Sequence, residues 1–250
     1  MSQGFMKQIN SLVYSSDLMI EVLDARFPER TRNVNIENRI LEKEKALLIV
    51  LNKADLTDKT ELEKEKKRLI KETQARVVFV SAKEKNGVRL LKREISIVKG
   101  KRTELTIGLL GYPNSGKSTL INALSGKGKG KVKTSSKAGY TRGLQKIKIS
   151  EGVYLIDAPG IIPYNVRDEF ELFLVGAKNA NQLKDIESAA LRLITELKEK
   201  IKKEFGVKST EDMEILEEIA LTKRFLASGG RADTQKAARF LLEKYDKNEL

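Results

Sequence analysis

The sequence contains no cysteine, no histidine and no tryptophan among its 250 residues. Without cysteine there is no disulfide and no thiolate metal site. Without histidine there is no imidazole base, metal ligand or pH switch. No apolar run approaches the roughly 20 residues that a membrane-spanning helix needs, and residues 1–7 lack the basic start and apolar block of a secretory signal. We therefore expect a cytoplasmic protein with no membrane partner.

Positive charge is abundant and unevenly distributed. Lys and Arg number 48 against 35 Asp and Glu, a net charge of +13, and residues 1–165 carry +14 while residues 166–250 carry −1. No acidic residue lies between Glu104 and Glu151. A basic stretch of this kind favours a polyanionic partner, most simply RNA. A solvated lysine-rich surface that merely attracts nucleotide is the alternative.

Strand-like and helix-like segments alternate through the first two thirds of the chain. The alternation predicts an α/β fold with a mainly parallel sheet. Six strands are expected, at residues 17–24, 46–51, 77–80, 105–110, 145–150 and 153–156. Glu151-Gly152 predicts a tight turn between the last two. From Arg167 onward the pattern is helical throughout, with Ser209 and Asp212 resembling a capping box. We expect two domains, residues 1–165 and a small all-helical domain at residues 166–250.

Residues 111–118 match the phosphate-binding pattern of a glycine, four free positions and Gly-Lys-Ser. An apolar strand precedes the motif and a helix follows it, which is the setting that the motif requires. Lys117 is expected to reach the outer phosphates, and Ser118 to ligate Mg²⁺. The residues expected to contact the nucleotide here are Pro113, Asn114, Ser115, Gly116, Lys117, Ser118 and Thr119.

A base-recognition motif follows the strand at residues 46–51. Asp55 can accept hydrogen bonds from the N1–H and exocyclic amine of guanine, a pair that adenine does not offer, so the motif selects GTP and GDP. Lys53 is expected to pack its stem over the base, and Asn52 to tie the loops together. Three further residues, at the end of the strand at residues 77–80, are expected to contact the base: Ser81, Ala82 and Lys83. The Ala82 N–H is expected to meet guanine O6.

The Mg²⁺ and γ-phosphate sensor is expected at residues 157–160. Asp157 would hold the ion through water, and the Gly160 N–H would face the γ-phosphate. Thr141 is the expected second protein ligand of Mg²⁺, with Thr134 as the weaker alternative. The residues expected to act on the transferred phosphate are Lys117, Thr141 and Gly160.

The order of these motifs is rotated relative to ordinary GTPases, because the base-recognition motifs come before the phosphate loop. This order predicts a circular permutation of the P-loop GTPase fold. The sequence resembles the circularly permuted ribosome-assembly GTPases of the RbgA/YlqF family. The segments that carry the resemblance are 24–28, 52–55, 111–118, 139–143, 157–161 and 225–230.

The resemblance implies a GTPase that acts on the large ribosomal subunit and contacts ribosomal RNA. Each strand should keep the neighbours that it has in an ordinary GTPase. The expected order across the sheet is that of the strands near residues 145, 153, 105, 17, 46 and 77. Two alternatives stay open: an RNA-binding checkpoint module whose hydrolysis serves only release, and a signalling or tRNA-directed GTPase.

Hydrolysis is expected to be slow without the ribosome or RNA. Ile161 stands where many GTPases have a water-orienting Gln, and the chain has no histidine to replace it. Asn114 resembles the asparagine of potassium-activated GTPases, in which a K⁺ ion stabilises charge near the β- and γ-phosphates. A residue making only local hydrogen bonds is the other interpretation of Asn114.

Overall fold

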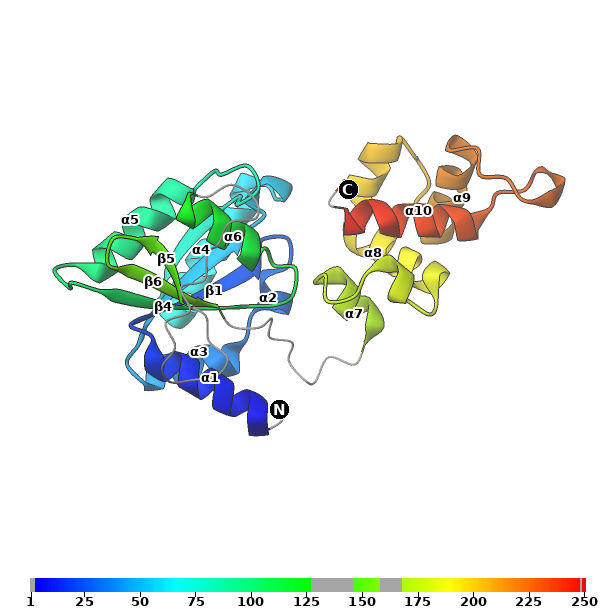
Figure 1. Cartoon of the computed structure of the whole chain (residues 1–250). Helices are drawn as coiled ribbons and strands as arrows, with labels where there is room; N and C mark the ends of the chain where they lie inside the picture. The colour runs from blue at the N-terminus through cyan, green and yellow to red at the C-terminus, as the bar shows by residue number, and fades with distance from the viewer. Residues whose placement is uncertain (1–2, 127–145, 158–167, 248) are drawn as a thin grey trace. The chain divides into compact units, whose positions relative to one another are not determined.

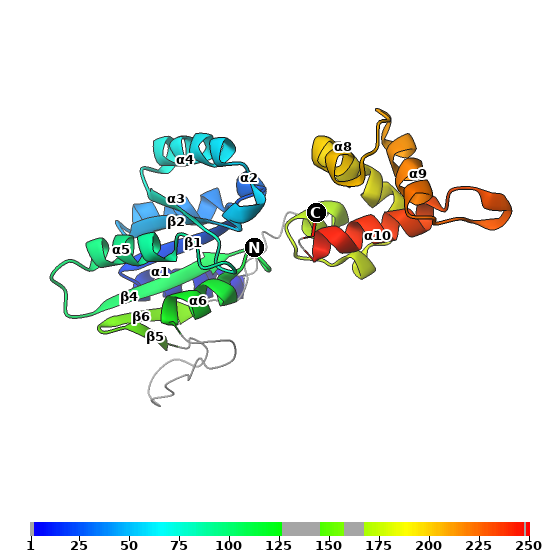
Figure 2. The same cartoon turned by 90° about the horizontal axis from the view of Figure 1, so that it is seen from above.

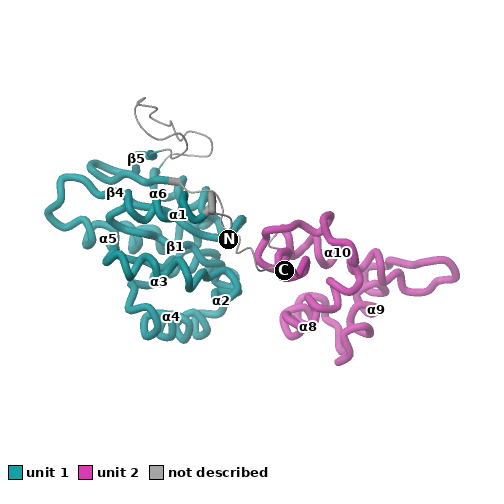
Figure 3. Tube along the Cα trace, turned by 90° about the horizontal axis from the view of Figure 1, so that it is seen from below, with its two compact units in different colours: residues 1–166 teal, residues 167–250 magenta. Residues whose placement is uncertain are grey.

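The computed structural model describes residues 3–126, 146–157, 168–247 and 249–250. The chain divides into two compact units, residues 1–166 and 167–250 (Figure 3). The sequence predicts a domain boundary after residue 165. Within the described residues, no helix has the length and apolar character needed to cross a membrane.

Unit 1 is built on one six-stranded sheet (Figure 1). Its strands are β1 (Leu18–Asp24), β2 (Ala46–Asn52), β3 (Arg76–Val80), β4 (Leu105–Gly111), β5 (Lys146–Ser150) and β6 (Val153–Asp157). The order across the sheet is β3-β2-β1-β4-β6-β5, and only the β5–β6 pair is antiparallel. The expected strand order is thereby confirmed.

Helices cover both faces of the sheet (Figure 2). They are α1 (Gln3–Ser15), α2 (Pro28–Thr31), α3 (Val34–Glu42), α4 (Lys59–Thr73), α5 (Val88–Lys99) and α6 (Lys117–Ser125), with the short η1 (Ala54–Leu56). α5 and α6 pack on one face through Leu91, Ile95 and Leu120. α1, α3 and α4 pack on the other through residues such as Leu12 and Ile40. Because strands buried on both faces read as continuous apolar runs, β1 and β2 could be located from sequence alone.

α5 is the connection that the permutation introduces. It carries the chain from β3 at one edge of the sheet to β4 near the middle. Gly87 precedes it in the left-handed region, φ +75°, and a Cβ there would lie 2.1 Å from the Phe79 carbonyl oxygen. A glycine is therefore required for the chain to turn from β3 into α5.

Unit 2 is helical in all its described elements. They are α7 (Glu169–Leu174), η2 (Ala180–Gln182), α8 (Ile186–Phe205), α9 (Asp212–Thr222), η3 (Ser228–Gly230) and α10 (Thr234–Asp246). Asp185 and Asp233 cap α8 and α10 with their side chains. The expected capping box at Ser209 is wrong: α9 begins after Glu211 with no side-chain cap, because the Ser209 hydroxyl donates to Glu218 Oε1 at 2.8 Å.

Candidate guanine-nucleotide site

The candidate site lies where the parallel strands end. Asp24 at the end of β1 pairs in register with Asn52 of β2, and Asn52 pairs with Val80 of β3. β4 ends at Gly111, beside Val22 of β1. The loops that follow these strands therefore share one edge of the sheet, which is the edge where open α/β sheets bind ligands.

The phosphate loop has a backbone that only glycine permits at two positions. A Cβ on Gly111 would lie 2.6 Å from the Val22 carbonyl oxygen, and a Cβ on Gly116 (φ +93°) would lie 2.1 Å from Asn52 Nδ2. Asn114 also has a positive φ, 57°. α6 begins directly after Gly116, and the N–H groups of its first turn have no carbonyl partner within the helix. This geometry forms an anion cradle at a helix N-terminus.

The side chain of Lys117 is held across the loop that it follows. Its Nζ donates to the carbonyl oxygens of Gly111 at 3.0 Å and Tyr112 at 2.6 Å. The ammonium group is thus kept beside the cradle. Ser118 and Thr119 are exposed on the first turn of α6, so the Ser118 hydroxyl is accessible as an oxygen ligand of the kind that Mg²⁺ prefers.

Asn52 joins the loops of the site. Its Nδ2 donates to the Ser115 carbonyl oxygen at 2.8 Å, and its Oδ1 accepts from the Ala82 N–H at 3.1 Å. The side chain is 2% exposed, so both bonds lie in a desolvated setting. The expected tie between loops is therefore present. The Ala82 N–H, predicted to meet guanine O6, already has an acceptor in Asn52, which O6 would share or displace.

Asp55 lies on η1 with its side chain exposed, and Lys83 is exposed on the neighbouring loop. Ser81 is buried between them and accepts from the Glu84 N–H at 3.4 Å. Asp55 is available to a ligand because Lys53, two residues before it, turns the chain out of β2 with φ +61°.

Asp24 and Arg26 lie in segment 24–28, which carries part of the resemblance, but sequence reasoning assigned neither residue a role in the site. Asp24 is fully buried, and its carboxylate accepts from Arg26 Nε at 3.0 Å and Arg26 Nη2 at 2.8 Å. Lys53 Nζ lies 2.8 Å from the same carboxylate. The ion pair with Asp24 thus holds the side chain of Lys53, which is expected to pack over the base. An acidic residue at the end of a buried strand, followed two residues later by Arg, was the available signal.

The charges around Asp24 decide its protonation. Burial alone raises the pKa of Asp24, but the hydrogen bond and charge of Arg26 and the charge of Lys53 outweigh it, and the pKa lies below its ordinary value. Burial also lowers the pKa of Lys53, and attraction to Asp24 offsets only part of that effect. Asp24 is therefore ionised at neutral pH.

A second buried acid, Glu21, lies beneath the phosphate loop. It accepts from the Asn33 N–H at 3.0 Å, and burial together with the nearby Glu37 raises its pKa well above the ordinary value. Glu37 forms a two-bond pair with Arg32, at 2.8 and 2.9 Å. Burial and Glu21 raise the pKa of Tyr112, the second residue of the phosphate loop, to about 12. A cavity of about 10 Å³ lies between Glu21 and Tyr112.

Most of the other residues predicted to contact the phosphates and Mg²⁺ belong to segments 127–145 and 158–167. Thr141, its alternative Thr134, Gly160 and Ile161 lie outside the described residues. Asp157 is the last residue of β6, beside Leu109 of β4. Its backbone is thus next to the strand that leads into the phosphate loop.

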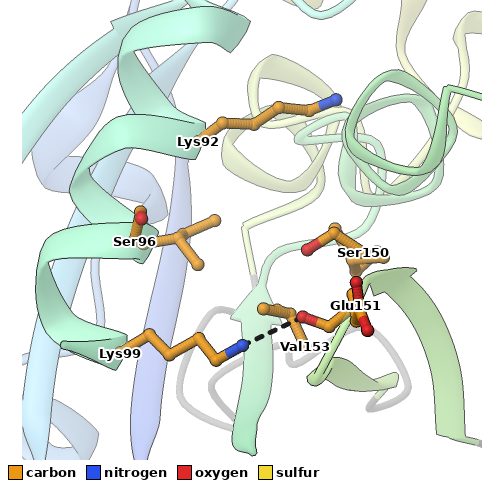
Figure 4. A pocket seen from close by; sticks show the side chains of 8 residues that line it. Lys92, Ser96, Lys99, Ser150, Glu151 and Val153 are labelled. Carbon is orange, nitrogen blue, oxygen red and sulfur yellow. Dashed lines mark hydrogen bonds between the residues drawn. The ribbon is translucent and has the colours of Figure 1, made fainter. Parts of the chain in front are cut away.

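A separate pocket of about 190 Å³ lies between α5 and the β5–β6 turn. Figure 4 shows Lys92, Ser96 and Lys99 of α5 facing Ser150 and Glu151, with Lys99 Nζ donating to the Glu151 carbonyl oxygen at 3.0 Å. Because the turn precedes β6 and lies beside the start of β4, this pocket is at the amino ends of the strands, away from the nucleotide site.

Comparisons with known proteins give the family. The model of the 50S ribosome-binding GTPase family matches residues 106–224, and that of ferrous iron transport protein B matches residues 8–95. An uncharacterised GTP-binding protein of Methanocaldococcus jannaschii is 37% identical over 98% of this chain and 65% of its own length. Nuclear/nucleolar GTPase 2 of Oryza sativa subsp. indica is 27% identical over 97% of this chain and 46% of its own length. The chain therefore spans less than two thirds of these relatives.

Solved structures agree along nearly the whole chain. GDP-bound YlqF of Thermotoga maritima superimposes with a TM-score of 0.67 and 25% identity, covering 97% of this chain and 95% of that one. The GNP-bound form of YlqF gives the same TM-score and covers 99% of this chain and 95% of its own. The phosphate loop follows the fourth strand of the sequence, and the base-recognition motifs follow the second and third strands. The chain belongs to the circularly permuted GTPases of the RbgA/YlqF family.

Proposed function

We propose that the protein binds GTP with Mg²⁺, hydrolyses it to GDP and phosphate, and serves as an assembly factor for the large ribosomal subunit, with RNA binding gated by GTP. The observation that carries this proposal is the position of Asn52, which bonds both the phosphate loop and the Ala82 loop. A ligand that has a guanine base and phosphates at opposite ends fits loops linked in this way.

The residues proposed to hold the nucleotide divide by ligand part. The base contacts Asn52, Lys53, Asp55, Ser81, Ala82 and Lys83. The phosphates contact residues 113–119 and the Gly160 N–H, and Mg²⁺ is held by Ser118, Thr141 and, through water, Asp157. Bound Mg²⁺ supplies charge stabilisation to the outer phosphates. The chain's own contribution is the Lys117 ammonium and the first-turn N–H groups of α6.

Asp55→Asn tests the guanine specificity. An Asn amide accepts only at its oxygen and offers N–H donors that clash with those of guanine, so GTP affinity should fall by about 100-fold or more. Xanthosine triphosphate, which has a carbonyl in place of the amine, should then bind better than GTP. Fluorescent-nucleotide titrations measure both, with ATP as the reference. An unchanged preference for GTP would refute the base assignment.

Assembly on the large subunit is tested by turnover and by co-sedimentation. We expect single-turnover hydrolysis to accelerate when large subunits are added, and the protein to sediment with them in the GTP-analogue state and leave in the GDP state. Sedimentation without any acceleration would favour the binding-module alternative. No sedimentation with either subunit would leave a signalling or tRNA-directed role.

Potassium dependence is a separate part of the proposal. If Asn114 helps hold K⁺ near the β- and γ-phosphates, hydrolysis should be at least about ten-fold faster in KCl than in NaCl, because the bound cation stabilises transition-state charge. Asn114→Ala should remove that difference while leaving GTP affinity within a few-fold. Equal rates in the two salts for the unmodified protein would exclude a K⁺ site.

A further inference from the structure

The segment between α9 and α10, residues 223–233, forms a short hairpin that projects from the helices of unit 2 (Figures 1 and 2). We call it the basic hairpin. Leu226 pairs with Ala232 in antiparallel fashion. The Ala227 N–H donates to the Arg231 carbonyl oxygen at 2.9 Å, and the Asp233 N–H donates to that of Phe225, also at 2.9 Å. The projection therefore has a defined backbone of its own.

Aromatic packing anchors the base of the hairpin to the helices. The rings of Phe225 and Phe240 meet edge-on with centroids 5.5 Å apart, and Phe240 in turn meets Phe205 at 6.1 Å. Lys236 Nζ lies 5.0 Å from the Phe225 ring centroid. A hairpin held in this way presents its tip at a fixed position on unit 2.

The tip itself is exposed and nearly free of side chains. Gly229 and Gly230 have φ of +78° and +76°, and among the residues that the structure describes a Cβ on either would meet nothing within 4 Å. Leu226 beside them is 54% exposed. The peptide groups of the tip are thus open to close approach by another molecule. Glycine-containing loops clamp nucleic-acid backbones in this manner in known RNA-binding modules.

Positive charge is concentrated on this part of unit 2. Residues 219–242 hold five basic side chains and one acidic one, whereas the rest of residues 167–250 holds 11 basic and 16 acidic. The single acid, Asp233, is engaged in capping α10, where it accepts from the Lys236 N–H at 2.9 Å. Arg224 and Arg231 are exposed, and neither forms an ion pair with any described residue. Unit 2 therefore has a basic end despite its near-neutral total.

We propose that the basic hairpin is the part of unit 2 that binds RNA, by contacting the phosphate backbone of a folded RNA. Arg224 and Arg231 pair with phosphates, the glycine tip brings backbone N–H groups against the same strand, and Leu226 packs on a ribose. The proposal rests on the RNA-binding part of the proposed function and adds the surface. An RNA fits better than a protein, because one exposed leucine among arginines offers little of the apolar core that protein interfaces have.

The test compares two charge-reversed variants of the full chain. Arg224→Glu/Arg231→Glu changes the hairpin. Lys184→Glu/Lys247→Glu makes the same charge change near the other end of α10, where the Ala180 N–H donates to Asp246 Oδ2 at 3.4 Å. The probe is an in-vitro transcript of large-subunit ribosomal RNA with a GTP analogue present. Circular dichroism and GTP affinity check that both variants fold.

The hairpin variant should bind the transcript at least ten-fold more weakly at 100 mM KCl, and the slope of log affinity against log salt should fall by about 1.5 to 2, as expected for two lost phosphate contacts. The control should stay within about three-fold of the unmodified protein. If the two variants bind alike, the hairpin assignment is overturned while the proposed function stands. If the unmodified protein binds no RNA, the RNA part of the proposed function fails with it. A hairpin variant that lost binding to a ribosomal protein but kept full affinity for the transcript would also overturn the proposal.

Discussion

The buried carboxylate of Asp24 determines where Lys53 lies, and this residue-scale contact has consequences for nucleotide binding. Replacing Asp24 by Asn removes the charge that compensates Lys53 and Arg26. We expect the free energy of unfolding to fall by about 3 kcal/mol, because removing one member of a buried ion pair leaves the other charge buried and uncompensated. Guanine-nucleotide affinity should fall with it, since Lys53 loses its position.

A double-mutant cycle separates the two effects of Asp24→Asn. Lys53→Met in the same background removes one stranded cation and should recover part of the lost stability, measured by urea unfolding, without recovering nucleotide affinity. If affinity were unchanged in Asp24→Asn, Asp24 would have no positioning role.

Glu21 and Asp24 affect the pH dependence of folding stability in opposite directions, because the pKa of Glu21 is raised and the pKa of Asp24 is lowered. The pKa of Glu21 is raised by burial and by Glu37, with Asn33 and Arg32 acting in the other direction. A raised acid pKa favours folding at low pH, and that contribution is lost as the pH rises from the unfolded value, about 4.3, through the folded value. Glu21→Gln stays neutral at every pH, so its melting temperature relative to the unmodified protein should rise between pH 5 and pH 8. A constant difference across that range would show that Glu21 does not titrate there.

At the scale of elements, the β5–β6 turn depends on a glycine. A Cβ on Gly152 (φ +62°) would lie 2.2 Å from the Thr103 carbonyl oxygen, and the Gly152 carbonyl accepts from the Leu105 N–H at 2.8 Å. Gly152→Ala should therefore destabilise the protein by about 2 to 4 kcal/mol, from strain plus the clash. Gly126→Ala is the matched control, because φ is +66° there and a Cβ would meet no atom of the described residues within 4 Å. Equal losses in thermal unfolding would mean that the clash is relieved by movement of residue 103.

The order of elements could be predicted from the sequence because each strand of the sheet carries a clear signal. Buried parallel strands are continuous apolar runs, and the motifs that follow them are known to lie at their carboxyl ends. Side-chain partners could not be predicted in the same way. The pairing of Lys53 with Asp24 depends on a left-handed residue at the end of β2. Likewise, the Ser209 hydroxyl donates to Glu218 in the second turn of α9 instead of capping that helix.

At the scale of the whole molecule, circular permutation changes what the proposed γ-phosphate sensor, residues 157–160, is connected to. β6 ends at Asp157, and unit 2 begins at Arg167, so the sensor leads directly into the helical unit. In the unpermuted order it would lead into the rest of the GTPase fold. Under the proposed function, a change at residues 157–160 on hydrolysis can therefore act on unit 2 through the chain that joins them. This connection is the physical basis for proposing that GTP controls RNA binding.

The absence of cysteine makes this proposal directly measurable. Lys67→Cys on α4 and Lys203→Cys on α8, both exposed, would be the only two thiols available for spin labels. We expect the distance distribution between the labels to shift or narrow when GDP is replaced by a non-hydrolysable GTP analogue, with and without RNA. A pair within unit 1, Lys67→Cys with Lys101→Cys, should stay the same and so exclude label motion as the cause. Identical distributions in both nucleotide states, free and RNA-bound, would mean that the nucleotide does not control unit 2, and any coupling to RNA would then have to act through unit 1 alone.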